Sequence, residues 1–418
     1  MKATYGVGVD WPISYAELEP YYLRAEQEIG VCGDDNVDLG SPRSGPYPLP
    51  PMPLTYLDRV ITGRLRPHGF KFVARPSARN SVPYDNRLAC HGFNSCSPIC
   101  PTGAQYAAIV HIRKAEALGV RVLEEALVTR VDVDKSGTVR SLTYKRPDGV
   151  EHRLTARAYV LAANGIETPR LMLISRSRRV PNGLANSSDQ VGRNLMDHPG
   201  LSVRFLMPVP IYAGRGPDYT VNFFGFRDGQ FRRFQAGWGM SLYNRLHLHD
   251  ITNELLQDGV VPPELDRQIR FRAGREVEFD THVELLPNPE NRIQLDDKRR
   301  DSGGLPLVRI NYRIGDYTLR GFEHCRQILR QFAKLLGAAR YRDRGVFSHH
   351  HLMGTTRMGD DPKASVVDRE CRAHDHRNLF IAGSSVFTTG STANPTLTIA
   401  ALSLRLAEAL KRELGVSA

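Results

Sequence analysis

The spacing of hydrophobic positions changes at several points along the chain. A helical pattern over 103–119 is followed by a valine-rich, strand-like stretch over 120–134, a β-meander with Ser-Gly and Asp-Gly turns, and a continuous apolar run over 158–165. A run of this kind that ends in glycine is typical of a parallel strand buried on both faces. A helix is expected directly after it. The order of these elements predicts part of an α/β domain built around a parallel sheet.

Residues 200–345 follow a different pattern. Apolar and polar positions alternate in several stretches, which favours an antiparallel sheet. One long amphipathic helix follows, and we expect its apolar face to pack on that sheet. The residues of this face are Phe322, Ile328, Leu329, Phe332 and Leu336.

After residue 346 the α/β pattern returns, with a second buried strand predicted over 378–387 and a helix over 396–415. We therefore predict an α/β domain built from two separated parts of the chain, with an α+β antiparallel-sheet domain inserted between them. The predicted division is an irregular segment with a helix beginning after Ser14 (1–89), the cysteine loop and first part of the α/β domain (90–199), the sheet domain (200–345) and the second part of the α/β domain (346–418).

Composition narrows the class of protein. Of the 418 residues, 41% are hydrophobic and 24% are charged, which is ordinary for a globular protein and unlike a disordered one. No apolar run reaches the ~18 residues that a membrane-spanning helix needs. The net charge of +11 is spread over the chain without a long basic run, so we predict no nucleic-acid partner.

Three of the six cysteines form a local group. Cys90, Cys96 and Cys100 are spaced C-x5-C-x3-C, and Pro101 follows the last of them. This spacing resembles an iron–sulfur binding loop. A zinc site would need a fourth ligand, and His91 is poorly placed to close a tetrahedron because it is adjacent to Cys90. Free structural thiols remain the other alternative.

Two further motifs carry candidate chemistry. The segment 394–396, Asn-Pro-Thr, directly precedes the last helix, with Asn394 as the expected N-cap and Pro395 as the expected first helical residue. The positive end of such a helix can face an anion. Upstream, three successive histidines at 349–351 offer a general base for neutral pH.

Several longer segments, taken together, resemble the glucose–methanol–choline (GMC) oxidoreductases, a family of flavoenzymes. They are DWPISYAELEPYY (10–22), NGIETPRLML (164–173), VGRNLMDHP (191–199), NPENRIQLD (288–296), HLMGTTRMG (351–359) and NLFIAGSSVFTTGSTANPTLT (378–398). The segments occur in family order and extend over nearly the whole chain. The resemblance implies an FAD-binding, Rossmann-like domain and the oxidation of an alcohol or sugar hydroxyl by hydride transfer to the flavin.

The resemblance also implies roles for single residues. His351 would take the hydroxyl proton and Asn394 would bind the same oxygen, because a hydride leaves readily only when that oxygen is becoming an alkoxide. We expect His350 to point into the same pocket and orient the substrate, and His349 to face solvent. The residues expected to contact FAD are Val128, Ala162, Ala163, Gly383, Ser384, Pro395 and Thr396.

Within this family, the cysteine group is similar to that of the catalytic subunit of bacterial FAD-dependent glucose dehydrogenase complexes. That similarity implies that Cys90, Cys96 and Cys100 bind a [3Fe-4S] cluster. It also implies two partners, a small subunit that carries an export signal and a membrane-anchored multihaem cytochrome. The complex would then lie at the periplasmic face of the inner membrane, and the chain would meet the membrane only through its partners.

One family feature is missing. The G-x-G-x-x-G motif of the first βαβ unit, which holds the FAD pyrophosphate, does not occur in the sequence. We therefore expect a chain that lacks its first βαβ unit. The alternative to an active dehydrogenase is a non-catalytic remnant that cannot hold FAD.

Overall fold

The computed structural model describes residues 1–416, and its largest sheet has six antiparallel strands. Their order is β1 (Phe72–Ala74), β7 (Val221–Phe226), β8 (Trp238–Tyr243), β9 (Glu276–Val283), β6 (Pro199–Leu206) and β12 (Arg340–Ser348). The antiparallel sheet predicted for 200–345 is confirmed. It also includes β1, from the segment before residue 90. The domain boundaries themselves remain predictions.

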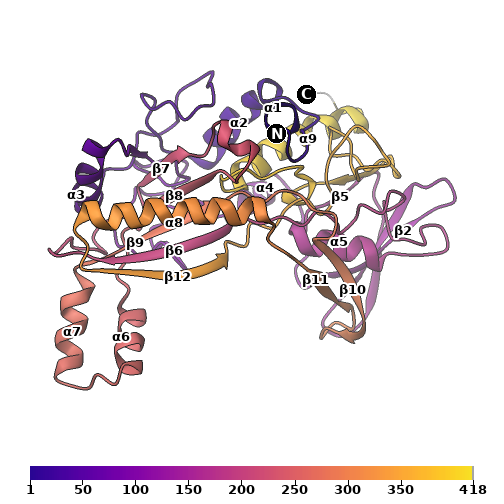
Figure 1. Ribbon diagram of the computed structural model, residues 1–418. Helices are drawn as coiled ribbons and strands as arrows, with labels where there is room; N and C mark the ends of the chain where they lie inside the picture. The colour runs from indigo at the N-terminus through magenta and orange to yellow at the C-terminus, as the bar shows by residue number, and fades with distance from the viewer. Residues whose placement is uncertain (417–418) are drawn as a thin grey trace.

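Helix α8 (Asp316–Leu336) lies along one face of this sheet (Figure 1). Its apolar face packs as expected, with Phe322, Leu329, Phe332 and Leu336 buried and Ile328 half-buried. Phe332 contacts the aromatic rings of Phe223 and Phe279 on the sheet. Helix α3 (Tyr56–Leu65) contacts α8, and a 3₁₀ turn (Arg66–His68) follows it.

The second unit is built around two parallel strands, β5 (Tyr159–Leu161) and β13 (Leu379–Ile381). Helix α5 (Asn164–Ile174) follows β5, and α9 (Thr396–Leu414) packs against α2 (Tyr15–Ile29). The meander consists of β2 (Leu127–Val133), β3 (Val139–Lys145) and β4 (Glu151–Leu154). Strands separated by more than two hundred residues of sequence thus form one parallel pair, as predicted.

Some predicted elements differ in extent or burial. The helix expected over 103–119 is α4 (Ile109–Ala117), and the strand expected over 120–134 begins only at Leu127. Burial of β5 on both faces was wrong. Val160 is 43% exposed. Within the described residues, β5 pairs only with β13, and the face of β5 that carries Val160 is left uncovered.

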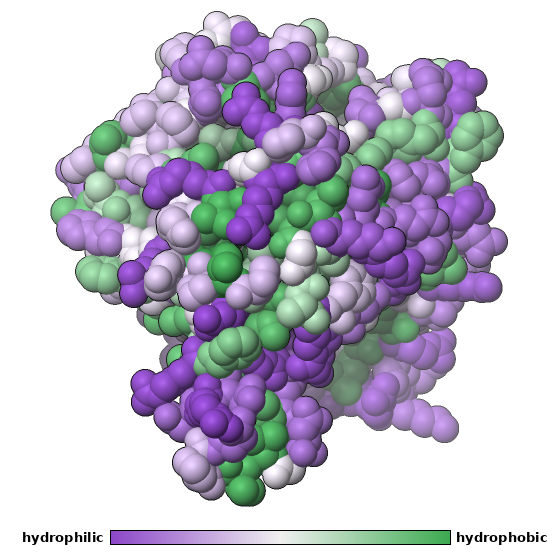
Figure 2. Space-filling view, turned by 60° about the vertical axis from the view of Figure 1, so that its left-hand side comes forward, coloured by the Kyte–Doolittle hydropathy of each residue, from purple (hydrophilic) through white to green (hydrophobic). Residues whose placement is uncertain are grey.

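The described residues also contain a separate hairpin, a short N-terminal helix and a projecting pair of helices. Strands β10 (Arg292–Arg300) and β11 (Pro306–Asn311) form a separate hairpin, and α1 (Lys2–Tyr5) is a single turn. Helices α6 (Leu248–Gln257) and α7 (Glu264–Ala273) form a pair that projects from the sheet (Figure 1). The projecting lobe carries exposed apolar side chains among polar ones (Figure 2). Within residues 1–416, none of the helices is both long and apolar enough to cross a bilayer.

Candidate active site

A cavity of about 430 Å³ lies where the two units meet. The sheet contributes Asn222, Met240 and His282, and the start of α9 contributes Thr392, Asn394 and Thr396. The segment after β1 adds a group of polar and charged side chains. They are Arg75, Ser77, Arg79 and Gln105. The lining is therefore rich in hydrogen-bonding groups, as a site for a polyhydroxylated molecule requires.

His351 does not line this cavity itself, but it contacts the lining residue Asn394 directly. Its Nε2 is 3.1 Å from Nδ2 of Asn394, and its backbone N–H donates to Asp197 Oδ1 at 2.8 Å. Burial lowers the pKa of His351 to about 3, with a further lowering by the neighbouring charges of His198, His349 and Arg75. The ring is therefore neutral near pH 7 and has a lone pair available to accept a proton.

Asn394 does not cap the last helix, which corrects the predicted N-cap by one residue. Pro395 is the N-cap of α9, and no side chain satisfies the free N–H groups of the first turn. The Asn394 amide instead points across the cavity, where its Oδ1 accepts from Nη2 of Arg75 at 3.3 Å. Arg75 also donates to Ser241 Oγ at 3.1 Å and lies over the ring of Tyr219, 4.2 Å from its centroid.

The orientation of the histidine triplet differs from the expectation. His349 is only 11% exposed, so the prediction that it faces solvent was wrong. Its Nε2 lies 2.9 Å from the Thr281 carbonyl and 3.3 Å from Asp280 Oδ1. His350 is exposed and contacts Ser348, its own neighbour in the chain. Strand β12 ends at Ser348 and His350 has a left-handed backbone (φ 60°), so the chain turns there; the rings of His349 and His351 lie near one another and His350 is exposed. The predicted orientation of His350 into the pocket is therefore corrected.

Three of the residues expected to contact FAD lie just beyond the ends of the parallel strands. Ala162 and Ala163 follow β5, Gly383 follows β13, and both alanines are exposed. A side chain at Gly383 would meet nothing within 4 Å, so open space lies over this edge. Cofactors bind at the carboxyl ends of parallel strands in such sheets, so this edge fits the cofactor.

The other predicted FAD contacts differ in exposure. Thr396 is exposed at the uncapped start of α9, whereas Pro395 is buried. Ser384 is buried and donates from Oγ to the Leu352 carbonyl at 2.6 Å, and Val128 is half-buried in β2. The free N–H groups of α9 suit an anionic group of the cofactor.

Cys90, Cys96 and Cys100 line one small cavity in the loop over 90–102. Burial raises the pKa of the Cys100 thiol, but hydrogen bonds from the backbone N–H of Gln105 and from Thr102 outweigh burial, and the pKa lies below its ordinary value. Burial raises the pKa of Cys96, partly offset by the charge of Arg79. In residues 1–416, no three His, Cys, Asp or Glu side chains are arranged to hold a single metal ion. The structure therefore gives no support to a zinc site.

The sequence analysis assigned no role to Arg75, His198, His282 or Asp280. His198 lies within the quoted VGRNLMDHP segment, directly before β6, and that position was the available signal. His282 and Asp280 are on β9, where only the period-two alternation placed them on one face. Arg75 follows β1, a three-residue strand that the sequence pattern did not reveal.

Comparisons with known proteins agree with this geometry. Two GMC oxidoreductase family models match residues 73–200 and 287–403. The chain is 40% identical to the fructose dehydrogenase large subunit of Gluconobacter japonicus, over 99% of this chain and 77% of that protein. It is 31% identical to 2-methyl-1,2-propanediol dehydrogenase of Mycolicibacterium austroafricanum, over 97% of this chain and 75% of that protein.

Solved structures show the same fold. A formate oxidase superposes with a TM-score of 0.68 at 14% identity, over 99% of this chain and 81% of that one. Pyridoxine 4-oxidase superposes with a TM-score of 0.64 at 18% identity, over 98% and 80%. The chain therefore belongs to the GMC oxidoreductases, FAD-dependent enzymes that act on the hydroxyl groups of alcohols and sugars.

Proposed function

We propose that the chain oxidises a hydroxyl group of a sugar or polyol to a carbonyl, with FAD as the hydride acceptor. The observation that carries this proposal is the pair formed by His351 and Asn394, whose Nε2 and Nδ2 atoms lie 3.1 Å apart, with Asn394 lining the cavity. A hydroxyl inserted between them can donate its proton to His351 while its oxygen accepts from Asn394. Both contacts grow stronger as the oxygen becomes negative, so both favour the transition state.

The charge of Arg75 supports the same step. Its guanidinium is bonded to Oδ1 of Asn394, which polarises the amide and strengthens the donor on the other side. The cation also lies close to the oxygen that develops negative charge. When bound, FAD supplies the acceptor for the hydride. The chain supplies the base, the donor and the positive field.

The substrate class rests on the cavity and on the relatives. Polar side chains surround the pair at several points of the cavity wall, as many hydroxyl groups would need. The relative at 40% identity is a fructose dehydrogenase subunit, and another relative is a diol dehydrogenase. A sugar or polyol fits both observations better than a simple apolar alcohol does.

The cysteine loop is proposed to bind a [3Fe-4S] cluster through Cys90, Cys96 and Cys100. Hydrogen bonds to sulfur stabilise thiolate ligands, and Cys100 faces donors from three residues of its own turn. Arg79 is 2% exposed, influences Cys96, and also lines the active-site cavity. A cluster held by these three cysteines would supply one-electron transfer. Such a relay suits a dehydrogenase that passes electrons to another protein.

The exposed surface of the cysteine loop also supports a proposal about partner proteins. Ile99 is 75% exposed, and Phe93 and Leu88 are exposed beside it, so the loop presents an apolar surface next to the cysteines. We propose that a multihaem cytochrome docks there and that a small subunit carries the export signal. The relative named as a large subunit supports a complex. The proposed location is the periplasmic face of the inner membrane, reached through these partners.

A direct experiment tests the reaction. The purified chain is loaded with FAD under anaerobic conditions and mixed with single hexoses, pentoses and polyols. Loss of the oxidised-flavin absorbance with a sugar or polyol, and formation of the matching carbonyl product, is the expected result. Failure to bind FAD would favour the non-catalytic alternative, whereas binding of FAD without reduction by any of these substrates would contradict the proposed substrate class.

A further inference from the structure

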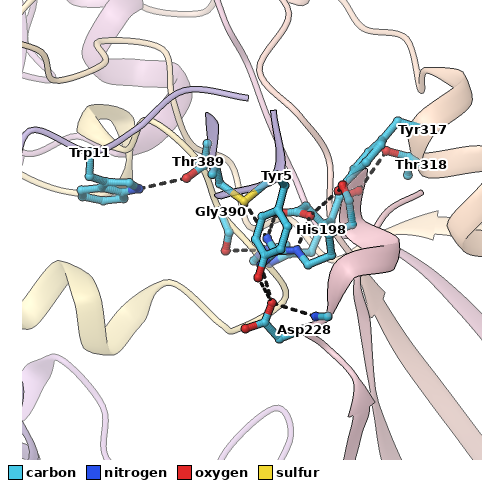
Figure 3. A network of polar contacts seen from close by, with 12 residues as sticks. Tyr5, Trp11, His198, Asp228, Tyr317, Thr318, Thr389 and Gly390 are labelled. Atoms are coloured by element: carbon cyan, nitrogen blue, oxygen red, sulfur yellow. Dashed lines mark hydrogen bonds and ion pairs between the residues drawn. The ribbon is translucent and has the colours of Figure 1, made fainter. Parts of the chain in front are cut away.

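A line of four hydrogen bonds runs from Arg75 through the catalytic pair into the interior of the protein. Arg75 Nη2 lies 3.3 Å from Asn394 Oδ1, and Asn394 Nδ2 lies 3.1 Å from His351 Nε2. His351 Nδ1 lies 3.0 Å from Nδ1 of His198, and His198 Nε2 lies 3.1 Å from the carbonyl of Gly390. The last contact appears in Figure 3.

The two end groups, Arg75 and the Gly390 carbonyl, determine which group donates in each of the four hydrogen bonds. A guanidinium can only donate, and a backbone carbonyl can only accept. The Asn394 oxygen therefore faces Arg75, and its NH₂ group donates to Nε2 of His351. His351 must then carry its single proton on Nδ1 and donate it to His198, which carries its own proton on Nε2 and donates it to Gly390. Each group between the ends has one donor and one acceptor in use.

We propose that His198 is a positioning residue that fixes the tautomer of His351, so that the lone pair on Nε2 faces the substrate hydroxyl. The inference rests on the proposed role of His351 as the base. A histidine with its proton on Nε2 has no lone pair toward the substrate and cannot accept the hydroxyl proton. The orientation of the proton is thus as important as the position of the ring.

His198 is suited to this role by its surroundings. It is 1% exposed, and its carbonyl partner Gly390 is held against Met353. A Cβ at residue 390 would lie 2.5 Å from the Met353 sulfur and 3.2 Å from His198 Nε2, so a larger residue would have to displace the Met353 side chain. Trp11 donates to Thr389 Oγ1 at 3.0 Å and fixes the adjacent residue (Figure 3).

The group that accepts the Nδ1 proton of His351 is the neutral ring of His198 rather than a carboxylate. Asp197 accepts from the backbone N–H groups of His351 and His198, at 2.8 and 2.7 Å, and from Ser348 Oγ, but it bonds to neither ring. Burial lowers the pKa of His198 to about 4, so it stays neutral and can accept. The other ionisable groups around the two rings are Arg75, Asp280, His282, His349 and His350.

Nuclear magnetic resonance tests the tautomer without any measurement of turnover. The full chain is labelled with ¹⁵N-histidine, loaded with FAD, and examined by two-bond ¹H–¹⁵N correlation at pH 7. We expect His351 to be protonated on Nδ1 alone and His198 on Nε2 alone, with each ring assigned from its own substitution. A His351 ring protonated on Nε2, or on both nitrogens, overturns the proposal, and this result needs only the His351 substitution for its assignment, so it does not depend on a folded variant of His198.

Two substitutions of His198 then test its role. His198→Asn keeps an oxygen acceptor near the Nδ1 position, whereas His198→Leu removes it. We expect Nε2-protonated His351 to appear in the leucine variant, with kcat reduced toward the ~10²–10⁴-fold loss of a missing general base, and the asparagine variant to recover part of both. His376→Leu is the control, because His376 is equally buried and bonds to the Gly137 carbonyl and the Ala185 N–H away from the cavity.

The outcomes separate this inference from the proposed function. If the leucine variant keeps the wild-type tautomer and turnover, or loses no more turnover than the His376 control, His198 has no positioning role. If the wild-type spectrum is as expected but no sugar or polyol reduces the flavin, the proposed reaction is wrong while the tautomer assignment is upheld.

Discussion

The ring of His349 is stacked on that of His282, with centroids 3.9 Å apart and planes 10° from parallel. The same stack continues to His351, whose centroid is 5.5 Å from that of His349. Asp280, two residues before His282 on β9, lies 3.3 Å from Nε2 of His349. A buried carboxylate thus holds one of three nearly parallel histidine rings, and the third of these rings belongs to His351.

This contact predicts a pH-dependent effect of Asp280→Asn on stability. Burial lowers the pKa of His349, but the hydrogen bond and charge of Asp280 outweigh burial, so the pKa lies above its ordinary value. A raised histidine pKa contributes stability that is complete below about pH 6.5 and is lost as the pH rises through the folded-state pKa. Burial also raises the pKa of Asp280, so the ionised carboxylate costs stability at high pH.

The pKa shifts of His349 and of Asp280 both reduce the stability of the wild-type protein as the pH rises. The Tm of Asp280→Asn should fall furthest below wild type near pH 5.5, and the difference should narrow toward pH 9. Differential scanning fluorimetry across this range measures it. Asp189→Asn is the control, because Asp189 pairs with Arg193 at an exposed position and its loss should have little effect at any pH. A difference that widens as the pH rises would contradict the assigned ion pair.

The family motifs were sufficient to single out His351 and Asn394, which the structure brings into contact, but not the histidines around them. His351 and Asn394 were found because each lies in a segment that matches the family in order. His349 and His350 were assigned to the wrong sides, because the left-handed backbone at His350 (φ 60°) turns the chain there and the local sequence does not reveal it. The surroundings of His349 depend on long-range contacts. Asp280 and His282 reach His349 only because β9, β6 and β12 are neighbours in the sheet.

Elements with strong local signals were predicted well. Ser14 and Glu17 form the expected capping box at the start of α2, and Gly415 ends α9 in the left-handed conformation. The three-residue strand β1 carries too short a pattern to detect, and so Arg75 directly after it was missed. The exposure of Val160 depends on what covers β5, which local sequence does not report.

Removing the catalytic histidine should reduce the rate without removing the cofactor. We expect His351→Ala to lower kcat by ~10²–10⁴ and Asn394→Ala to lower it less, because the second change removes a hydrogen bond and not the proton acceptor. Flavin content from absorbance spectra should match wild type in both variants. His249→Ala, on the projecting helix α6, serves as the control. If His350→Ala reduces turnover and His351→Ala does not, the base has been assigned to the wrong histidine.

The cysteine loop makes a prediction about metal content. Anaerobically purified chain should be brown and contain about three irons, as the proposed [3Fe-4S] cluster requires. Cys96→Ser should abolish electron transfer to a cytochrome while reduction of a small soluble dye continues in part. Cys325→Ala is the control, because Cys325 is a buried core residue of α8, outside the loop. A colourless protein with one zinc per chain would exclude the cluster.

Gly165 predicts how packing affects the catalytic residue. It lies in the first turn of α5, and a Cβ there would be 2.6 Å from the carbonyl oxygen of Leu352, the residue after His351. A backbone atom cannot move aside as a flexible side chain can, so Gly165→Ala must displace the segment that holds His351. Overpacking of this kind costs about 1–3 kcal/mol. We expect a lower Tm and, because the base moves, a lower kcat with the flavin still bound.

The matched control is Gly63→Ala in α3. Gly63 is also inside a helix, but it is exposed and a Cβ there would meet nothing within 4 Å. Alanine should therefore stabilise that helix by roughly 0.5–1 kcal/mol and leave turnover unchanged. Opposite shifts in Tm for the two glycines, with kcat lowered only for Gly165→Ala, are the expected pair of results. Equal shifts would mean that helix propensity, rather than the contact with Leu352, controls the effect at Gly165.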